Sequence, residues 1–343
     1  MKSIFVITGL SLISFNLLAQ PDKIEGGPVN VPADGIVDGV FIQQHIPTKR
    51  MIPYEYVREA DMIWSKRVWQ YIDLREKINL PMYFPKDEVR ADGVWVRNSN
   101  RWSLWTVIRE YVFKGELQIF APFDPLLSLS GGGSNWDGDQ LKYPIDMIMP
   151  GETDSAYQKR ILYYFGTEIK DPNAQPLTDE FGDPLVVTDT VTGVESYVYP
   201  PAELKWYNTQ DVVQYRIKED WFFDKERSVL DVRIIAIAPV IQETTIDANG
   251  NKSFGRMREL FWLYFPHCRF VFNNYFVYND QNDAQWMSFD DLFWKRRFNS
   301  TIYKESNTFD RNIESYRMGV DALMEAEKIK EEIRVIEHDV WSF

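Results

Sequence analysis

Cysteine and histidine are scarce in this chain, and their scarcity excludes several kinds of site. The sequence has one cysteine, Cys268, and three histidines, His45, His267 and His338. It contains no HExxH pair and no Cys/His cluster with the spacing of a zinc site. We therefore expect no metal centre. A single cysteine also means that no internal disulfide bond can stabilise the fold, so stability must come from a packed core.

Long apolar segments are missing after residue 20, and positive charge is in deficit. No stretch beyond that point is long and apolar enough to span a bilayer. The 38 Lys and Arg residues stand against 51 Asp and Glu residues, which gives a formal charge of −13. So acidic a chain is poorly suited to bind nucleic acid or anionic lipid. We expect neither nucleic-acid binding nor direct membrane insertion.

The first 19 residues have the pattern of a secretory signal peptide. Lys2 supplies the charge, residues 4–18 the apolar run, and Ala19 a small residue at the cleavage site. A retained N-terminal anchor is the alternative. No cysteine follows the apolar run, so a lipoprotein signal is absent. We expect a mature chain that begins at Gln20 and lies on the far side of the inner membrane.

Aromatic residues are abundant, with 12 Trp, 18 Tyr and 22 Phe in a chain that is 45% hydrophobic. A protein of this size buries about 75% of the surface that its unfolded chain exposes. Most of these rings are therefore expected in the core. Trp and Tyr are also enriched at protein interfaces, so some of them are candidates for contacts with partners.

Composition divides the chain into five segments. Pro and Gly punctuate an extended lead after the signal peptide, and a Pro-, Asp- and Thr-rich stretch predicts a surface insertion with a small hairpin. The parts before and after the insertion are expected to form one compact unit. The segments are the signal peptide 1–19, the lead 20–53, a mixed helical part 54–166, the insertion 167–203, and hairpins with C-terminal helices 204–343.

The fold class predicted from these patterns is α+β: a mainly antiparallel sheet with long hairpins, packed by several helices, with an extended N-terminal lead and a long C-terminal helix. Residues 234–241 are apolar on both faces, which is typical of an internal strand. A turn at 224–227 precedes this run, and Asn249-Gly250 returns the chain through 258–265. Residues 269–276 predict a further strand.

Helices are predicted from spacings of three and four residues. The first, at 54–79, places Trp64, Val68 and Tyr71 on its buried side, and Pro81 stops it. A second runs over 100–114. Ser288 caps a third, and the last, at 312–340, carries a short heptad seam. That seam either docks on the protein's own sheet or reaches a neighbouring subunit.

The search for catalytic chemistry returns weak candidates. Adjacent His267 and Cys268 point to opposite faces of a strand, so they do not form a dyad there. The glycines at 131–133 lack the Lys-Ser/Thr pair of a phosphate loop, and Asp137 with Asp139 makes only a partial calcium motif. A carboxylate pair for glycoside hydrolysis stays open, since its separation depends on the fold.

Three stretches together resemble a known family. They are DMIWSKRVWQYIDLREKINLPMYFP (61–85), YRIKEDWFFDKERSVLDVRIIAIAPV (215–240) and RELFWLYFPHCRFVFNNYFVYN (258–279), and MSFDDLFWKRRFNSTIYKESN (287–307) agrees with them. They are similar to GldN, called PorN in species that do not glide, of the type IX secretion system of Bacteroidetes. The resemblance extends over most of the mature chain.

The resemblance implies a periplasmic component with a structural role and no enzymatic one. Family members assemble with an outer-membrane lipoprotein, GldK or PorK, into a ring-shaped scaffold beneath the outer membrane, and the family carries no catalytic residues or cofactor. A ring needs two different contact faces on each subunit. The interface candidates are Trp69 and Arg75, the strip Met82, Tyr83 and Phe84, and the C-terminal seam with Ile329, Ile333 and Ile336.

Three hypotheses follow for contacts beyond the core. Trp69→Ala or Ile333→Glu is expected to weaken assembly while the subunit stays folded. Cys268 is a candidate for a disulfide bond to a partner, against the plainer interpretation of a small buried residue. The acidic lead and insertion could bind a basic partner. The alternative function is a periplasmic protein that binds glycans through its aromatic residues or cleaves them with carboxylates.

Overall fold

The computed structural model describes most of the chain after residue 50. The predicted signal peptide, the lead up to residue 50 and most of the glycine-rich loop lie outside the described residues. The described ranges are 51–90, 95–98, 101–124, 137–146, 154–169, 175–178, 184–188, 195–200, 203–246, 252–282 and 287–341.

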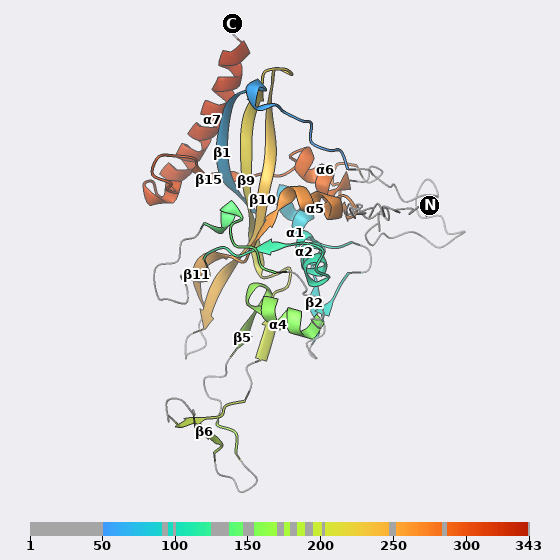
Figure 1. The fold of residues 1–343 in the computed structure, drawn as a ribbon, viewed down its shortest axis with the longest axis vertical. Coiled ribbons are helices and arrows are strands. Elements are labelled where there is room, and N and C mark those ends of the chain that lie inside the picture. Colours follow the sequence, from blue (N-terminus) through green and yellow to red (C-terminus); the bar gives the residue numbers. More distant parts are fainter. Residues whose placement is uncertain are drawn as a thin grey trace, which may run out of the picture.

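The described residues form an α+β fold around a mainly antiparallel sheet, which confirms the predicted class (Figure 1). The strands are β1 (Met62–Asp73), β2 (Glu88–Val89), β3 (Trp95–Val96), β4 (Ile119–Phe120), β5 (Gly166–Ile169), β6 (Val186–Thr188), β7 (Glu195–Tyr197), β8 (Glu203–Trp206), β9 (Val212–Asp224), β10 (Val229–Ile246), β11 (Lys252–Glu259), β12 (Trp262–Tyr264), β13 (Phe276–Val277), β14 (Met287–Ser288) and β15 (Thr301–Glu305). The α-helices are α1 (Leu80–Tyr83), α2 (Leu104–Phe113), α4 (Asp154–Phe165), α5 (Phe265–Phe272), α6 (Phe289–Trp294) and α7 (Val320–Trp341).

The central sheet has the strand order β15-β1-β9-β10-β12-β4, and β11 also pairs with β10. The long β9–β10 hairpin forms its middle, and the predicted turn at 224–227 connects these two strands. β10 pairs with β9 on one side and with both β11 and β12 on the other. The predicted internal strand at 234–241 therefore lies in the centre of the sheet, which explains why both of its faces are apolar.

The prediction of a helix at 54–79 is wrong, because its central part is the strand β1 and no α-helix lies in the segment. β1 pairs with β9 over nearly its whole length and with β15 at its C-terminal end. Its charged residues pair across the strands: Arg67 forms a bidentate ion pair with Asp220, and Lys66 lies 3.1 Å from Glu305. The charges that suggested the solvated side of a helix thus stabilise neighbouring strands.

The predicted strand at 269–276 is also wrong, because α5 continues to Phe272 and occupies the first half of it. Pro266 lies in the first turn of α5, where a missing N–H costs nothing, and aromatic side chains on the helix pack into the core. The predicted cap of the next helix is confirmed. Ser288 and Asp291 form a capping box at the start of α6, where Asp290 also lies in the first turn.

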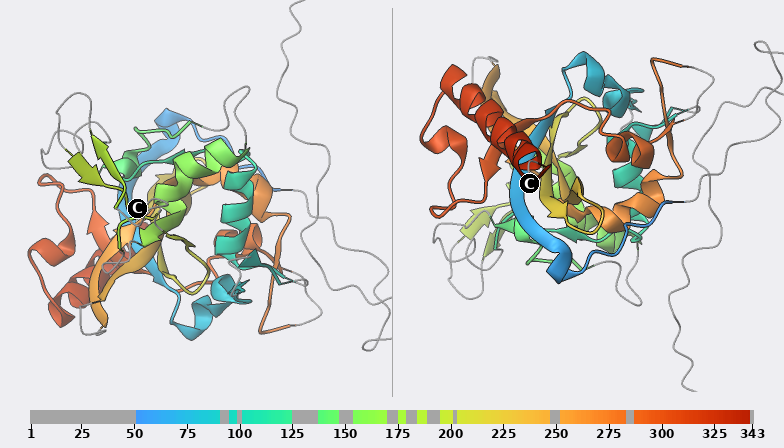
Figure 2. Two further views of the ribbon diagram at one scale, coloured as in Figure 1. Left: turned by 90° about the horizontal axis from the view of Figure 1, so that it is seen from below. Right: turned by 90° about the horizontal axis from the view of Figure 1, so that it is seen from above.

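Two parts of the core hold the helices to the sheet. The larger one joins the inner side of the sheet to α2, α4, α5 and α6. A smaller one, Val68, Ile302, Ile313, Ala326, Ile329 and Ile333, holds α7 against β1 and β15. Viewed along the long axis, α7 crosses the sheet beside β1, while α5 and α6 lie away from it (Figure 2). The heptad seam of the last helix is therefore docked on the subunit's own sheet.

The insertion extends away from the body of the molecule. β5 and β8 pair at its base, and β6 and β7 form the small hairpin that the sequence predicts. Figure 1 shows this hairpin at the end of the molecule farthest from α7. We call the described residues 175–178, 184–188 and 195–200 the arm.

Candidate functional site

The residues that the sequence marked as interface candidates near β1 lie in different environments. Trp69 is only 6% exposed, and Met82 is fully buried. Tyr83 is half-buried, whereas Phe84 and Arg75 are exposed, with Arg75 bound to Asp73. The buried pair contributes to the subunit's own core. An interface role thus stays a prediction that Arg75, Tyr83 and Phe84 are best placed to fulfil.

The seam residues of α7 divide in the same way. Ile329 and Ile333 are buried against β1 and β15, and Ile336 is half-buried one turn further on. A different face at the start of α7 is exposed and apolar, and the heptad spacing does not predict it because that spacing marks only the buried side of the helix. The exposed apolar residues are Val320, Leu323 and Met324 on α7 and Phe309, Tyr316 and Met318 in the segment before it, and we call them the α7 surface. The guanidinium of Arg311 lies 4.8 Å from the ring centre of Phe309 and 4.5 Å from that of Tyr316.

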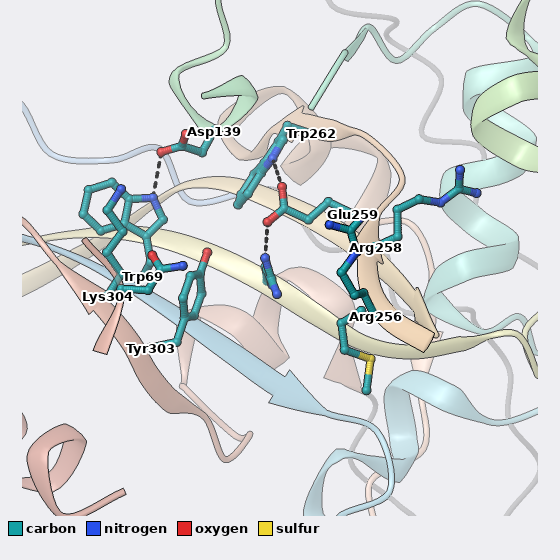
Figure 3. A pocket seen from close by; sticks show the side chains of 11 residues that line it. Trp69, Asp139, Arg256, Arg258, Glu259, Trp262, Tyr303 and Lys304 are labelled. Atoms are coloured by element: carbon teal, nitrogen blue, oxygen red, sulfur yellow. Dashed lines mark hydrogen bonds and ion pairs between the residues drawn. The ribbon is translucent and has the colours of Figure 1, made fainter. Parts of the chain in front are cut away.

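Beside β11 the structure has a pocket of about 260 Å³ on the outer face of the sheet. We call it the β11 pocket. It brings Trp69 from β1 next to residues that are far away in the sequence (Figure 3). Its walls are Trp69, Asp139, Arg216, Arg256, Met257, Arg258, Glu259, Trp262, Tyr303, Lys304 and Asn312. No sequence pattern predicts this grouping, because residues from six separate places in the chain contribute to it.

Each carboxylate of the β11 pocket is held by an indole and a cation. Trp69 donates its Nε1–H to Asp139 at 2.9 Å, and the Lys218 ammonium lies 3.6 Å from the same carboxylate. Trp262 donates to Glu259 at 2.8 Å, and Arg216 donates to the other oxygen of Glu259. Figure 3 shows Trp262 and Glu259 on one side of the pocket and Trp69 with Asp139 on the other.

Burial and these carboxylate partners shift the pKa values of the buried cations beside the pocket. Burial lowers the pKa of Lys218, although Asp139 acts against that shift. Burial alone would also lower the pKa of Arg216, but the neighbouring Glu259 outweighs it and the pKa is raised. Lys304 lies over the ring of Trp69 at 4.6 Å and binds Asp310 at 2.6 Å. Arg256 is exposed, and within the described ranges no carboxylate pairs with it. The arrangement suits an acidic group of a ligand.

Buried charges elsewhere in the molecule connect elements of the fold. Arg269 on α5 binds Asp290 on α6 at 2.7 Å, and burial raises the pKa of Asp290 in spite of Arg269. Glu219 on β9 accepts hydrogen bonds from Gln70 and from both terminal nitrogens of Arg296. These pairs lie inside the subunit, where they fix the positions of strands and helices.

Cys268 lies in the core on α5, and burial raises the pKa of its thiol above the usual range. A disulfide bond to a partner would require this side chain to leave the core. Because Cys268 and His267 are neighbours on a helix and not on a strand, they still diverge, and the His267 ring packs on Tyr264. In the described part of the chain, no three His, Cys, Asp or Glu side chains converge as metal ligands.

The comparison with known families decides what kind of protein carries these surfaces. The family model described as "Gliding motility associated protein GldN" matches residues 57–342. The chain belongs to the GldN family. The match spans the sheet, the helices and the arm, and it confirms the resemblance found in the four sequence stretches. The GldN-family chain is thus a component of the gliding-motility and type IX secretion machinery. No curated protein matches the sequence. Among the described helices, none is both long and apolar enough to cross a membrane.

Proposed function

We propose that this GldN-family chain is a non-enzymatic structural subunit of the type IX secretion and gliding machinery. It lies in the periplasm and assembles with an outer-membrane lipoprotein of the GldK or PorK kind into a ring scaffold. The observation that carries this proposal is the family match over residues 57–342, which covers nearly all of the described fold. The signal-peptide pattern at 1–19 supports export.

The chemistry of the β11 pocket supports binding in preference to catalysis. General acid-base catalysis needs a titrating group that can reach a substrate, with a pKa near the working pH. Asp139 and Glu259 instead hold indole N–H groups and cations of their own subunit. Both carboxylates are thereby fixed as acceptors in the wall of the pocket.

The exposed apolar surfaces support assembly. Soluble monomers rarely expose contiguous apolar patches, and such patches mark contacts with other proteins. The α7 surface combines methionines, which adapt to different partners, with an arginine between two aromatic rings. We propose that this surface, together with Arg75, Tyr83 and Phe84, contacts a protein of the same assembly.

The decisive experiment is electron microscopy of the mature protein, purified alone and together with its lipoprotein partner. We expect ring-shaped particles that contain both proteins. A protein that stays monomeric with the lipoprotein and binds or cleaves peptidoglycan fragments would support the glycan alternative and refute the scaffold.

A variant tests the α7 surface within this experiment. Met324→Glu is expected to leave the fold intact and to reduce recovery of the complex, because a charge would be placed in an apolar contact. Lys330→Glu, on an exposed part of the same helix, is the matched control. Equal recovery of the two variants would exclude the α7 surface from the assembly.

A further inference from the structure

The β11 pocket has more positive than negative side chains, although the chain as a whole is strongly acidic, with a formal charge of −13. The cations that line it are Arg216, Arg256, Arg258 and Lys304, and the carboxylates are those of Asp139 and Glu259. A cavity in which one sign of charge is in excess concentrates ligands of the opposite sign. The charge of the lining therefore favours an anionic ligand over a cationic one.

Two of these cations are open to a ligand. Arg256 is exposed, and no carboxylate in the described part of the chain pairs with it. The Lys304 side chain is 14% exposed and binds Asp310 at 2.6 Å, but the Asp310 side chain is 75% exposed. Water screens so exposed a partner, and a ligand can therefore compete with it for Lys304. Arg258, in contrast, is held by the Tyr207 hydroxyl at 2.8 Å and by a carboxylate of β10 at 3.5 Å.

Arg216 has a donor that its own subunit does not use. One of its terminal nitrogens donates to Glu259, and its guanidinium lies 4.9 Å from the ring centre of Tyr303. The buried Nε–H of Arg216 has no acceptor among the described residues. Buried donors without an acceptor are rare in folded proteins, and each one calls for a partner such as a ligand or an ordered water molecule. Arg216 thus has hydrogen-bonding capacity to offer at the pocket.

The other walls of the pocket are aromatic and apolar. Figure 3 shows Trp69, Trp262 and Tyr303 around the same space. Met257 adds a half-buried, flexible apolar side chain. The volume of about 260 Å³ lies just below the range of roughly 300–1,000 Å³ that is usual for sites of drug-sized ligands. The pocket therefore suits a small group that has an acidic end and an apolar stem.

We propose that the β11 pocket binds a carboxylate carried on a short apolar stem. The carboxylate lies beside Arg216, Lys304 and the Tyr303 hydroxyl, and the stem packs on Met257. Exposed Arg256 adds a positive charge at the rim. The site lies within one subunit, so it is independent of the proposed scaffold: a chain that forms no ring but binds a carboxylate in this pocket would refute the scaffold alone.

A singly charged carboxylate fits this lining better than phosphate does. Asp139 and Glu259 remain in the wall of the pocket and would repel the second negative charge of a phosphate. A guanidinium also matches the planar shape of a carboxylate. The same chemistry is offered by a free organic acid and by an acidic side chain of a polypeptide, and the choice of probes separates these two sources.

Ligand-detected NMR with the mature chain tests the site. The probe is phenylacetate, and its neutral counterpart phenylacetamide is the control. Phenylacetate is expected to have a Kd at least about tenfold lower than phenylacetamide, because only the acid pairs with the cations. Inorganic phosphate is expected to bind more weakly than phenylacetate. No binding of phenylacetate, equal binding of acid and amide, or tighter binding of phosphate would each overturn the proposal.

Variants of Lys304 and its partner place the probe in the pocket. Lys304→Gln is expected to raise the Kd of phenylacetate about tenfold. Lys328→Gln is the matched control, since it also removes a lysine that forms ion pairs, on exposed α7. Circular dichroism is expected to show the wild-type fold in both variants.

Asp310→Asn acts in the opposite direction and keeps the test decisive if Lys304→Gln fails to fold. It frees Lys304 from its partner, so the Kd of phenylacetate is expected to fall about threefold. A structural defect would not tighten binding. Asp280→Asn removes an exposed acid that does not line the pocket and is the control. Wild-type affinity in both Lys304→Gln and Asp310→Asn would show that the probe binds elsewhere and would overturn the assignment.

A pair of peptides identifies the source of the carboxylate. Acetyl-Gly-Glu-Gly-amide carries one acidic side chain, and acetyl-Gly-Gln-Gly-amide is its neutral counterpart. If the Glu peptide binds more tightly than phenylacetate and the Gln peptide does not bind, the site takes an acidic side chain of a polypeptide. If phenylacetate binds and neither peptide does, the site takes a free organic acid. Equal binding of the two peptides, with the acid and amide probes also equal, would show that charge is not recognised and would refute the proposal.

Discussion

Trp69 on the outer face of the sheet is buried, packs against other apolar residues and donates a hydrogen bond, so the effects of replacing it can be calculated. Its indole is 6% exposed, packs against Ala236, Ala238 and Trp262, and donates a hydrogen bond to Asp139. Truncating a buried aromatic residue to alanine costs about 3–5 kcal/mol. Trp69→Ala is therefore expected to lower the free energy of unfolding by about this amount.

Trp69→Phe separates the loss of the hydrogen bond to Asp139 from the loss of apolar packing. Phenylalanine keeps much of the apolar contact but leaves the Asp139 carboxylate without its N–H donor. A hydrogen bond to a charged group contributes about 1.5–3 kcal/mol, so Trp69→Phe is expected to lose about that much. Ile63→Ala lies on the exposed part of the same strand and is the control, with an expected change within about 1 kcal/mol.

The assay is urea unfolding of the mature chain, followed by circular dichroism. The variants are then tested for recovery of the lipoprotein at a temperature where each remains folded. If Trp69→Ala keeps the wild-type unfolding free energy and loses the lipoprotein, then Trp69 anchors an interface and the role assigned to it in the core is wrong. If Trp69→Ala is less stable but its folded molecules still recover the lipoprotein normally, the result supports the role of Trp69 in the core.

Three further predictions follow from buried groups. Ile333→Glu places a charge among Val68, Ile302 and Ile329, so it is expected to lower the free energy of unfolding in urea by about 4 kcal/mol or more. The control is Val335→Glu, at a side chain that is 41% exposed, and it is expected to change this free energy by about 0.5 kcal/mol or less. Equal losses for the two variants would contradict the docking of α7. Burial raises the pKa of Asp87, so the folded state holds this proton to higher pH than the unfolded state does, and the group's contribution to stability falls as pH rises from the usual aspartate value through the raised one. Asp87→Asn is expected to remove that fall, measured as urea midpoints between pH 4 and 7, and an unchanged pH profile would contradict the assignment. The Cys268 thiol is expected to react with a thiol reagent only after unfolding, and rapid modification of the folded chain would show that α5 opens.

The sequence predicts the hairpin region well and the N-terminal region poorly, and the difference has a physical cause. β10 is apolar on both faces and follows directly after β9 at a tight turn, so its neighbours in the sheet are also neighbours in the sequence. β1 is buried on both faces only around Trp69, and its pairing partners lie more than a hundred residues away. Its alternation is therefore hidden, and the accidental spacing of Trp64, Val68 and Tyr71 imitates a helix.

The β-branched and aromatic residues of β1 favour a strand, and greater weight on that signal would have corrected the prediction. For α5 the same signal misleads, because Phe265, Phe270 and Phe272 suggest a strand while Pro266 begins a helix. The β11 pocket lies beyond prediction from one sequence. Its walls come together only when β1, β11, β15 and the segment around Asp139 are placed in space.

The length of β10 has a mechanical consequence for a component of a motility machine. At about 3.3 Å per residue, its 18 residues span about 60 Å, and β9, β12 and β11 are all bonded to it. A pull along the molecule from the α7 end toward the arm would act parallel to these strands. Many ladder hydrogen bonds would then have to yield together, whereas a pull across the sheet would open them one at a time. The sheet is therefore expected to resist a pull along its strands more strongly than a pull across them.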